Sequence, residues 1–135
     1  LRRMSRRMAD GRKIDVTTAI SHSACTIAAD IQADAVITVT MSGFTATRLS
    51  RYKPTCPILA CTTKSSVACR LNLLFATYPL IIQEEDNMEH LFESAIRQAR
   101  LAGYVKPGDT VVLTAGVPLG SSGKTNMVRV EEVRE

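Results

Sequence analysis

The chain has 135 residues, of which 45% are hydrophobic and 22% charged, and its formal net charge is +4. This length predicts one domain large enough to bury a core, and no apolar run approaches the ~20 residues that a membrane span needs. Six basic residues fall within residues 1–13, which leaves 11 basic and 12 acidic residues from Ile14 onward. A near-neutral body with few aromatic side chains argues against a nucleic-acid partner. Residues 1–13 are interpreted as a basic linker ahead of a domain at residues 14–135.

The cysteines and the start of the chain favour a cytoplasmic location. Cys25, Cys56, Cys61 and Cys69 include no C-x-x-C pair, and the two histidines are remote from them in sequence, so a zinc site is not expected. Each cysteine has apolar neighbours, which is typical of buried free thiols in a reducing compartment. No apolar run follows the basic residues at the start, so no signal peptide is predicted.

The first predicted element is a helix from Asp15 to about Ala33. Its apolar residues recur at helical spacing, and Asp15 with Thr17 and Thr18 supplies an N-cap. The apolar positions are Val16, Ala19, Ile20, Ala24, Ile27, Ala28 and Ile31. Because this face is rich in small side chains, the helix can pack closely on a sheet or on a second helix.

The stretch Ala35–Thr47 combines a strand, a turn and the start of a helix. Its β-branched residues up to Val39 predict a buried strand, Ser42-Gly43 predicts a turn, and the residues that follow predict a helix to about Tyr52. Hydroxyl groups and backbone N–H groups at a helix N-terminus bind phosphate or carboxylate without a charged side chain. The same residues can instead simply cap the helix, and the pattern by itself leaves both interpretations open.

The rest of the chain continues to alternate strands with helices. The predicted elements are a strand at Ile58–Thr62, a helix from Thr63–Ser65 through Leu74, a strand at Tyr78–Ile82, a helix from Asp86 to about Ala102, and strands at Thr110–Thr114 and Met127–Val133. This alternation predicts an α/β fold with three layers, α/β/α, and a five-stranded, mostly parallel sheet. Only a loop separates the last two strands, so we expect the fifth strand to be antiparallel and at an edge of the sheet.

The loop between the last two strands, Gly116–Thr125, resembles a P-loop but departs from its motif. The motif requires Gly five residues before Gly123, where this chain has Pro118, and its Lys opens a helix, whereas a strand pattern follows Thr125 here. What remains is a Gly- and Ser-rich loop whose one cation, Lys124, can close over an anion; a plain hairpin loop is the alternative. No set of residues forms a complete catalytic or metal site.

Three motifs at specific spacings resemble the C-terminal domain of pyruvate kinase. They are T-x-S-G-x-T-A at Thr40–Ala46, R-Y-K-P-x-C-P-I at Arg51–Ile58, and K-P-G-D-x-V-V at Lys106–Val112 with T-N-x-x-x-V after the Gly-rich loop. The resemblance covers nearly the whole chain, from about Asp15 to Val133. It implies a five-stranded sheet in the order 3-2-1-4-5 with an antiparallel fifth strand, which places the carboxyl ends of strands one and four side by side.

The resemblance also implies a binding site for a phosphorylated allosteric effector. The residues implied to hold a phosphate, here called the cradle, are Thr40, Met41, Ser42, Gly43, Phe44 and Thr45. The residues implied to close over it, here called the lid, are Gly120, Ser121, Ser122, Gly123, Lys124 and Thr125. Family members regulated by fructose 1,6-bisphosphate often add a Trp and an Arg after the third strand, and this chain has no Trp. A monophosphate such as AMP or a pentose phosphate is therefore at least as compatible with the sequence.

By the same resemblance we expect the chain to be regulatory rather than catalytic. In the family a separate (β/α)8 barrel domain transfers phosphate from phosphoenolpyruvate to ADP and holds Mg²⁺ and K⁺, and none of its motifs occurs here. The expected partners are that barrel domain in the same chain and further copies of this domain, because the family tetramer uses it in a two-fold contact. A free-standing small-ligand-binding protein or enzyme of the same fold is the alternative, and an α/β interaction module without a ligand is a third.

Overall fold

The computed structural model of the chain describes residues 15–40, 43–85, 87–115 and 126–134. Its elements, in chain order, are α2 (Val16–Ile31), β1 (Ala35–Val39), α3 (Phe44–Arg51), β2 (Ile58–Thr62), α4 (Ser65–Leu71), β3 (Thr77–Ile81), α5 (Met88–Leu101), β4 (Thr110–Ala115) and β5 (Met127–Glu132). Each element predicted from the sequence is present, and the largest difference is α4, which ends at Leu71 rather than Leu74. The linker predicted at residues 1–13 lies outside the described residues. No helix in the described part of the chain is long and apolar enough to cross a membrane.

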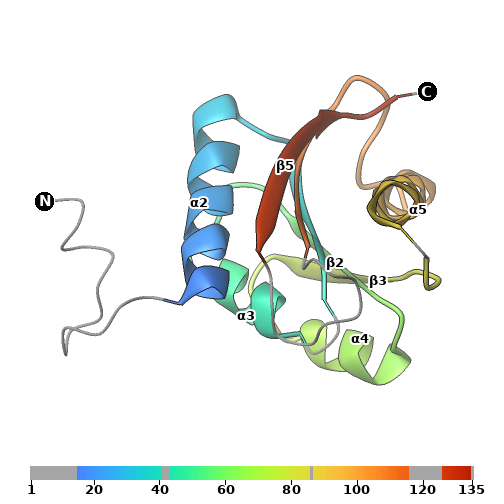
Figure 1. The fold of residues 1–135 in the computed structure, drawn as a ribbon, viewed down its shortest axis with the longest axis horizontal. Helices are drawn as coiled ribbons and strands as arrows, with labels where there is room; N and C mark the ends of the chain where they lie inside the picture. The colour runs from blue at the N-terminus through green and yellow to red at the C-terminus, as the bar shows by residue number, and fades with distance from the viewer. Residues whose placement is uncertain (1–14, 41–42, 86, 116–125, 135) are drawn as a thin grey trace, which may run out of the picture.

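The five strands form one sheet in the order β3-β2-β1-β4-β5. β1 pairs in parallel with both β2 and β4, β2 pairs in parallel with β3, and β4 pairs antiparallel with β5. Figure 1 shows β5 at one edge of the sheet, next to the long helix α2, which contacts it. The mostly parallel sheet, its antiparallel fifth strand and the strand order implied by the resemblance are therefore confirmed.

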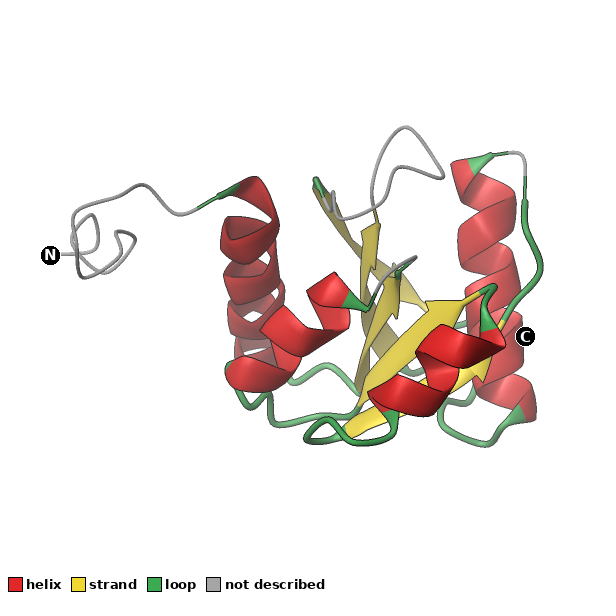
Figure 2. Ribbon diagram, turned by 90° about the horizontal axis from the view of Figure 1, so that it is seen from below, coloured by secondary structure: helices red, strands yellow, loops and turns green. Residues whose placement is uncertain are grey.

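The helices cover the two faces of the sheet unequally. Because side chains alternate along a strand, Ile37 of β1 packs on the α5 side, whereas Val36 packs on the opposite side, under α2. α2 contacts α3 on that second face, and α4 continues the layer over β2 and β3. Figures 1 and 2 show α2 and α5 on opposite sides of the sheet. This is the predicted three-layer α/β/α arrangement.

The α5 face holds the larger hydrophobic core. Phe92 of α5 is buried there against apolar residues of the three central strands. The strand residues in this cluster are Ala35, Ile37, Leu59, Cys61, Val111, Leu113 and Ala115. Complete burial of a large apolar side chain contributes about 1.5–3 kcal/mol, so this face supplies the larger share of the hydrophobic stabilisation.

α2 buries a face that only partly matches the one that its apolar spacing predicts: Ala24 and Ala28 are buried as expected. Val16 and Ile31 are 61% and 44% exposed, whereas small and hydroxyl-bearing side chains face the sheet. The buried residues of the helix are Thr17, Thr18, Ser21, Ala24, Cys25 and Ala28. Small side chains let the helix axis approach the strands closely, so close packing decides the rotation of the helix rather than its largest apolar residues.

Local sequence signals set the helix ends. Asp15 Oδ1 accepts a hydrogen bond from the Thr18 N–H at 2.7 Å, which caps α2, and this hydrogen bond lowers the pKa of Asp15. After α5 the chain turns at Gly103, where φ is +84°. There the Tyr104 N–H donates to the Ala99 carbonyl at 3.0 Å, as in a Schellman motif. The N-cap at Asp15 agrees with the prediction from residue type.

Candidate functional site

The carboxyl ends of β1 and β4 meet where the connections of the sheet change direction. β1 leads into α3 on one face, whereas the connection into β4 passes through α5 on the other. The two strands are direct neighbours in parallel register, with Thr38 opposite Thr114. Ligands of open α/β sheets bind in the crevice at such a switch point, which makes this edge of the sheet the candidate site.

Four of the six cradle residues are described, and they lie at this edge. Thr40 directly follows β1 and is buried, and its Oγ1 accepts a hydrogen bond from the Gly43 N–H at 2.8 Å. Phe44 begins α3 and is exposed, whereas Thr45 is buried. Residues Met41–Ser42 lie outside the described residues. The first turn of α3 carries no acidic side chain, so no carboxylate there opposes an anion.

Gly43 determines the shape of the cradle turn. Its φ is +87°, in the left-handed region that favours glycine. A Cβ on this residue would lie 3.3 Å from Leu71 Cδ2 and 3.6 Å from Val67 Cγ1, both of α4. The Gly43 carbonyl accepts hydrogen bonds from the N–H and the Oγ1 of Thr47, each at 3.0 Å. Glycine is therefore favoured by the backbone conformation, and a Cβ here would be in tight contact with Leu71 of α4.

The predicted lid, Gly120–Thr125, lies outside the described residues, but the residues on either side of its loop are described. Ala115 ends β4 and pairs with Met127 at the start of β5. Asn126 donates its N–H to the Ala115 carbonyl at 3.2 Å. Both ends of the loop that contains the lid therefore lie at the same edge of the sheet as Thr40.

Two cationic side chains near this edge, Lys64 and Arg48, are not among the site residues that the sequence predicts. Lys64 is exposed and stands at the N-cap of α4, where its N–H donates to Thr62 Oγ1 at 3.2 Å. Arg48 Cζ lies 4.7 Å from the centre of the Phe44 ring. The four-residue spacing from Phe44 to Arg48 is a sequence signal for the second contact. Lys64 follows β2 and the cradle follows β1, and these two strands are neighbours in the sheet. The spacing of residues along the chain does not reveal this pairing.

Hydroxyl groups without hydrogen-bond partners lie beneath the candidate site on the α2 face. Thr38 Oγ1 and Thr114 Oγ1 are buried and have no hydrogen-bond partner among the residues that the structure describes. Because Thr38 and Thr114 are register partners on adjacent strands, their side chains are neighbours on one face. A buried hydroxyl left unpartnered costs about 1–3 kcal/mol, so this layer is polar at a cost in stability.

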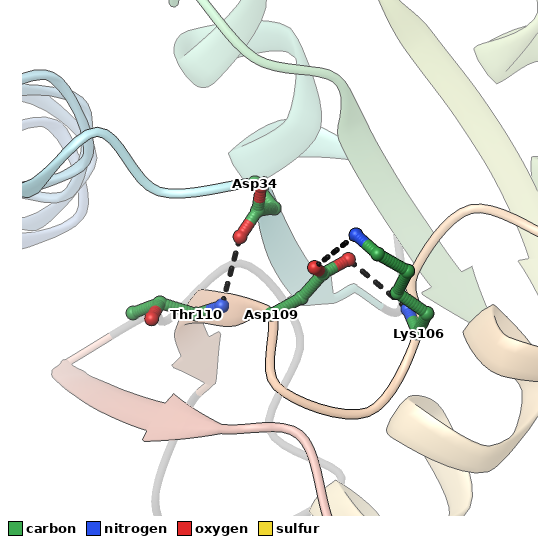
Figure 3. Close-up of polar contacts among 4 residues, drawn as sticks. All are labelled: Asp34, Lys106, Asp109 and Thr110. Carbon is green, nitrogen blue, oxygen red and sulfur yellow. Dashed lines mark hydrogen bonds and ion pairs between the residues drawn. The ribbon is translucent and has the colours of Figure 1, made fainter.

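A polar cluster at the opposite edge of the sheet serves the fold. Figure 3 shows it where the chain enters β4. Asp109 accepts hydrogen bonds from Lys106 Nζ at 2.8 Å and from the Lys106 N–H at 3.0 Å, and these bonds lower the pKa of Asp109. Asp34 Oδ2 accepts the Thr110 N–H at 2.9 Å. Each carboxylate holds a backbone N–H group in a turn or at a strand end, which explains the K-P-G-D motif structurally.

The buried cysteine thiols are not nucleophiles. Burial raises the pKa of Cys61 to about 12 and that of Cys25 to about 11, so both remain protonated thiols at neutral pH. The prediction that all four cysteines are buried is wrong for Cys69, which is exposed on the short helix α4. Among the residues that the structure describes, no group of three or more His, Cys, Asp or Glu side chains is placed to hold a metal ion.

A family model described as pyruvate kinase, alpha/beta domain, matches residues 18–131. The pyruvate kinase of Clostridium acetobutylicum is 40% identical over 121 residues, which are 90% of this chain and 26% of that protein. The pyruvate kinase of Lactobacillus delbrueckii subsp. bulgaricus is 35% identical over 117 residues, 87% of this chain and 20% of that protein. The pyruvate kinase of Thermotoga maritima is 35% identical over 119 residues, which are 88% of this chain and 25% of that protein. The chain therefore spans a quarter or less of the length of most of these relatives, and its match over residues 18–131 shows that it belongs to the family of the pyruvate kinase alpha/beta domain.

Proposed function

We propose that the chain is the regulatory and assembly part of a pyruvate kinase, in which the cradle and the lid bind a phosphorylated allosteric effector. One observation carries this proposal: Thr40 and both ends of the loop after β4 lie at one edge of the sheet, at its switch point. Two loops from adjacent parallel strands can enclose one small ligand between them. The proposed effector class is a sugar phosphate or a nucleoside monophosphate.

The chemistry of the cradle suits an anion. α3 begins at this edge, and the positive end of its dipole is not offset by an acidic residue in the first turn. The Gly43 N–H donates to Thr40 Oγ1 at 2.8 Å, so these two residues are already held together and a ligand does not have to bring them together. Backbone N–H groups and hydroxyls would contact the phosphate, and Lys64 would add positive charge from the neighbouring strand end.

The assembly role rests on α2 and β5. Within the described part of the chain β5 pairs only with β4, so its outer edge is open to a further strand. Val130 on β5 is 48% exposed, and Val16 and Ile31 are exposed apolar residues at the two ends of the adjacent helix α2. An open strand edge beside a helix with exposed apolar residues suits a two-fold contact between identical subunits in a homotetramer.

Catalysis would belong to the remainder of a longer polypeptide. The support is that the relatives are pyruvate kinases of which this chain covers 20–26%. A separate barrel domain would transfer phosphate from phosphoenolpyruvate to ADP, giving pyruvate and ATP in glycolysis, and would hold Mg²⁺ and K⁺. The cytoplasm is the setting of this proposed reaction, and the isolated chain would not catalyse it.

Thermal unfolding with a panel of ligands tests the effector site. The panel contains AMP, ribose 5-phosphate, fructose 1,6-bisphosphate and inorganic phosphate. A ligand at 100 times its Kd stabilises the folded state by about 2.7 kcal/mol, and we expect at least one member of the panel to raise the Tm. If the Tm is unchanged throughout the panel, the chain has no such site.

Ser42→Asp tests the cradle itself. A carboxylate placed beside the start of α3 repels a bound phosphate, and we expect the Kd of the best panel member to rise by about tenfold or more, or about 1.4 kcal/mol. Thr26→Asp is the control, because it adds the same charge on an exposed position of α2. Equal affinities of the two variants would contradict the assignment of the cradle.

A further inference from the structure

Phe44 places an exposed aromatic ring beside the turn of the cradle. It is the first residue of α3, directly after Gly43, and is 37% exposed. The three Phe and three Tyr residues of the chain are all described, and Phe92 is buried. The other exposed ones follow the ends of helices or lie near the start of β3, toward the opposite edge of the sheet; they are Tyr52, Phe75, Tyr78 and Tyr104. Phe44 is therefore the only Phe or Tyr ring exposed at the edge that carries the candidate site.

Arg48 supports the Phe44 ring from one helical turn further along α3. Its Cζ lies 4.7 Å from the centre of the ring, which is within the range of a cation–π contact. Hydrogen bonds from Thr18 and, to a smaller extent, the charge of Arg48 lower the pKa of Asp15 at the start of α2. Figure 1 shows α3 beside the first turns of α2, and the two helices are in contact. We call Phe44 and Arg48 the shelf, which lies between the starts of α2 and α3.

A second pair of the same kind shows what a purely structural role looks like. Arg129 Cζ lies 5.0 Å from the centre of the Phe92 ring, which is 1% exposed. Arg129 Nη2 also pairs with Glu89 Oε1 at 2.7 Å, so this pair closes a core and links α5 to β5. In the shelf the ring is exposed, and Arg48 Nε is buried with no hydrogen-bond partner among the described residues. Closure of a core therefore does not explain the shelf.

A shelf of this kind beside an anion site suits a ligand that joins a phosphate to a flat aromatic group. Aromatic side chains and guanidinium planes stack on nucleobases, and every base has a face that can stack. In a nucleoside monophosphate one ribose separates the phosphate from the base. A phosphate at the start of α3 therefore leaves the base close to the helical turn that carries Phe44. A sugar phosphate has no flat aromatic group to place there.

We propose that Phe44 and Arg48 bind the base of a nucleoside monophosphate whose phosphate lies in the cradle. The inference rests on the proposed function and narrows its ligand class from sugar phosphates and nucleoside monophosphates to the second alone. The base stacks on the exposed surface of the Phe44 ring, while Arg48 supports the ring and adds positive charge close to the phosphate. The first turn of α3 thus contributes backbone N–H groups to the phosphate and a ring to the base.

AMP and ribose 5-phosphate form a matched pair of probes, because AMP is ribose 5-phosphate with adenine attached at C1′. Calorimetric titration of the chain measures the Kd of each, and the ratio of the two values isolates what the base contributes. We expect AMP to bind about tenfold more tightly than ribose 5-phosphate, as one stacked base contributes on this scale. Because the contact is made through the face of the base rather than its edge, we expect GMP to bind within about threefold of AMP.

Substitutions in the shelf test which residues produce this ratio. Phe44→Leu removes the flat ring and keeps an apolar side chain, and we expect the preference for AMP to fall from about tenfold to below about threefold. Phe44→Trp keeps a flat ring and should keep the preference. Arg48→Met keeps the unbranched stem without the guanidinium, and we expect the preference to fall by about two- to threefold. Because only the ratio is compared, a general weakening of phosphate binding does not imitate these results.

Phe75→Leu is the matched control, because it makes the same change at a ring that is 55% exposed in the connection from α4 to β3. We expect this control to keep the full preference for AMP. Equal affinity of the parent chain for the two probes overturns the inference and leaves the proposed function standing, and so does a Phe44→Leu variant that keeps the tenfold ratio. Failure of both probes and of inorganic phosphate to bind the parent chain contradicts the proposed function and this inference together.

Discussion

The two faces of the sheet use different side chains at the same level of the strands. On the α5 face, Ile37 and Leu113 pack against the buried ring of Phe92. One residue further along the same strands, Thr38 and Thr114 point to the α2 face, and their buried hydroxyls have no hydrogen-bond partner in the described part of the chain. α2 covers them with small and hydroxyl-bearing side chains.

This difference suggests that one face of the sheet serves stability and the other serves the candidate site. On the α5 face, the residues of β1 and β4 that enter the core are all apolar, and their burial stabilises the fold. The α2 face becomes polar at the carboxyl ends of β1 and β4, directly beneath the candidate effector site. Proteins tend to depart from good packing at functional sites. We infer that the α2 face gives up stability near the cradle, whereas the α5 face provides it.

Removing the central aromatic ring of the α5 face should have the largest effect. Phe92→Ala deletes a buried ring, over which Arg129 Cζ also lies at 5.0 Å, and should lower the free energy of unfolding by about 3–5 kcal/mol. Urea unfolding followed by circular dichroism measures this. The control is Cys25→Ala, a truncation on the α2 face, for which we expect a much smaller loss. An equal loss in both variants would show that the two faces contribute alike.

Replacing the unpartnered hydroxyls should have a smaller effect of the opposite sign. Thr114→Val keeps the shape of the side chain and removes a buried polar atom, and should raise the free energy of unfolding by about 1 kcal/mol. Thr40→Val is the control, because its Oγ1 accepts the Gly43 N–H at 2.8 Å and its loss should cost about 1 kcal/mol. Urea unfolding measures the free energy of unfolding of both variants. If both changes lower it, the Thr114 hydroxyl has a hydrogen-bond partner in solution.

We expect the smallest effect in the turn that enters β4, which belongs to neither of the two core faces. Hydrogen bonds from the side chain and then the N–H of Lys106 lower the pKa of Asp109. The stabilisation is therefore complete above the unfolded pKa of about 3.9 and is lost as the pH falls through the lower folded value. We expect Asp109→Asn to show a shallower loss of stability between about pH 5 and pH 2 than the parent chain. Parallel urea-stability curves for the two proteins over this range would argue against the ion pair.

Residue patterns predicted the elements well because the signals are local. The apolar runs at Ala35–Val39 and Ile58–Thr62 are buried strands, and Asp15 caps α2 as its residue type predicted. The α/β class followed from the alternation of strands and helices. The strand order came from the family resemblance, since no spacing within the chain specifies which strands pair. The effector residues remain a prediction.

The sequence by itself determined where helices and strands begin, because caps, turns and β-branched runs act within a few residues of one another. Only the tertiary structure decided that α2 turns Thr17 and Ser21 inward and leaves Val16 and Ile31 exposed, because helix rotation depends on the surface against which the helix packs. It also decided that Tyr78 and Tyr104 meet at one end of the sheet while Thr40 lies at the other. Contacts between residues so distant in sequence follow from the chain's path through space, which local preferences do not encode.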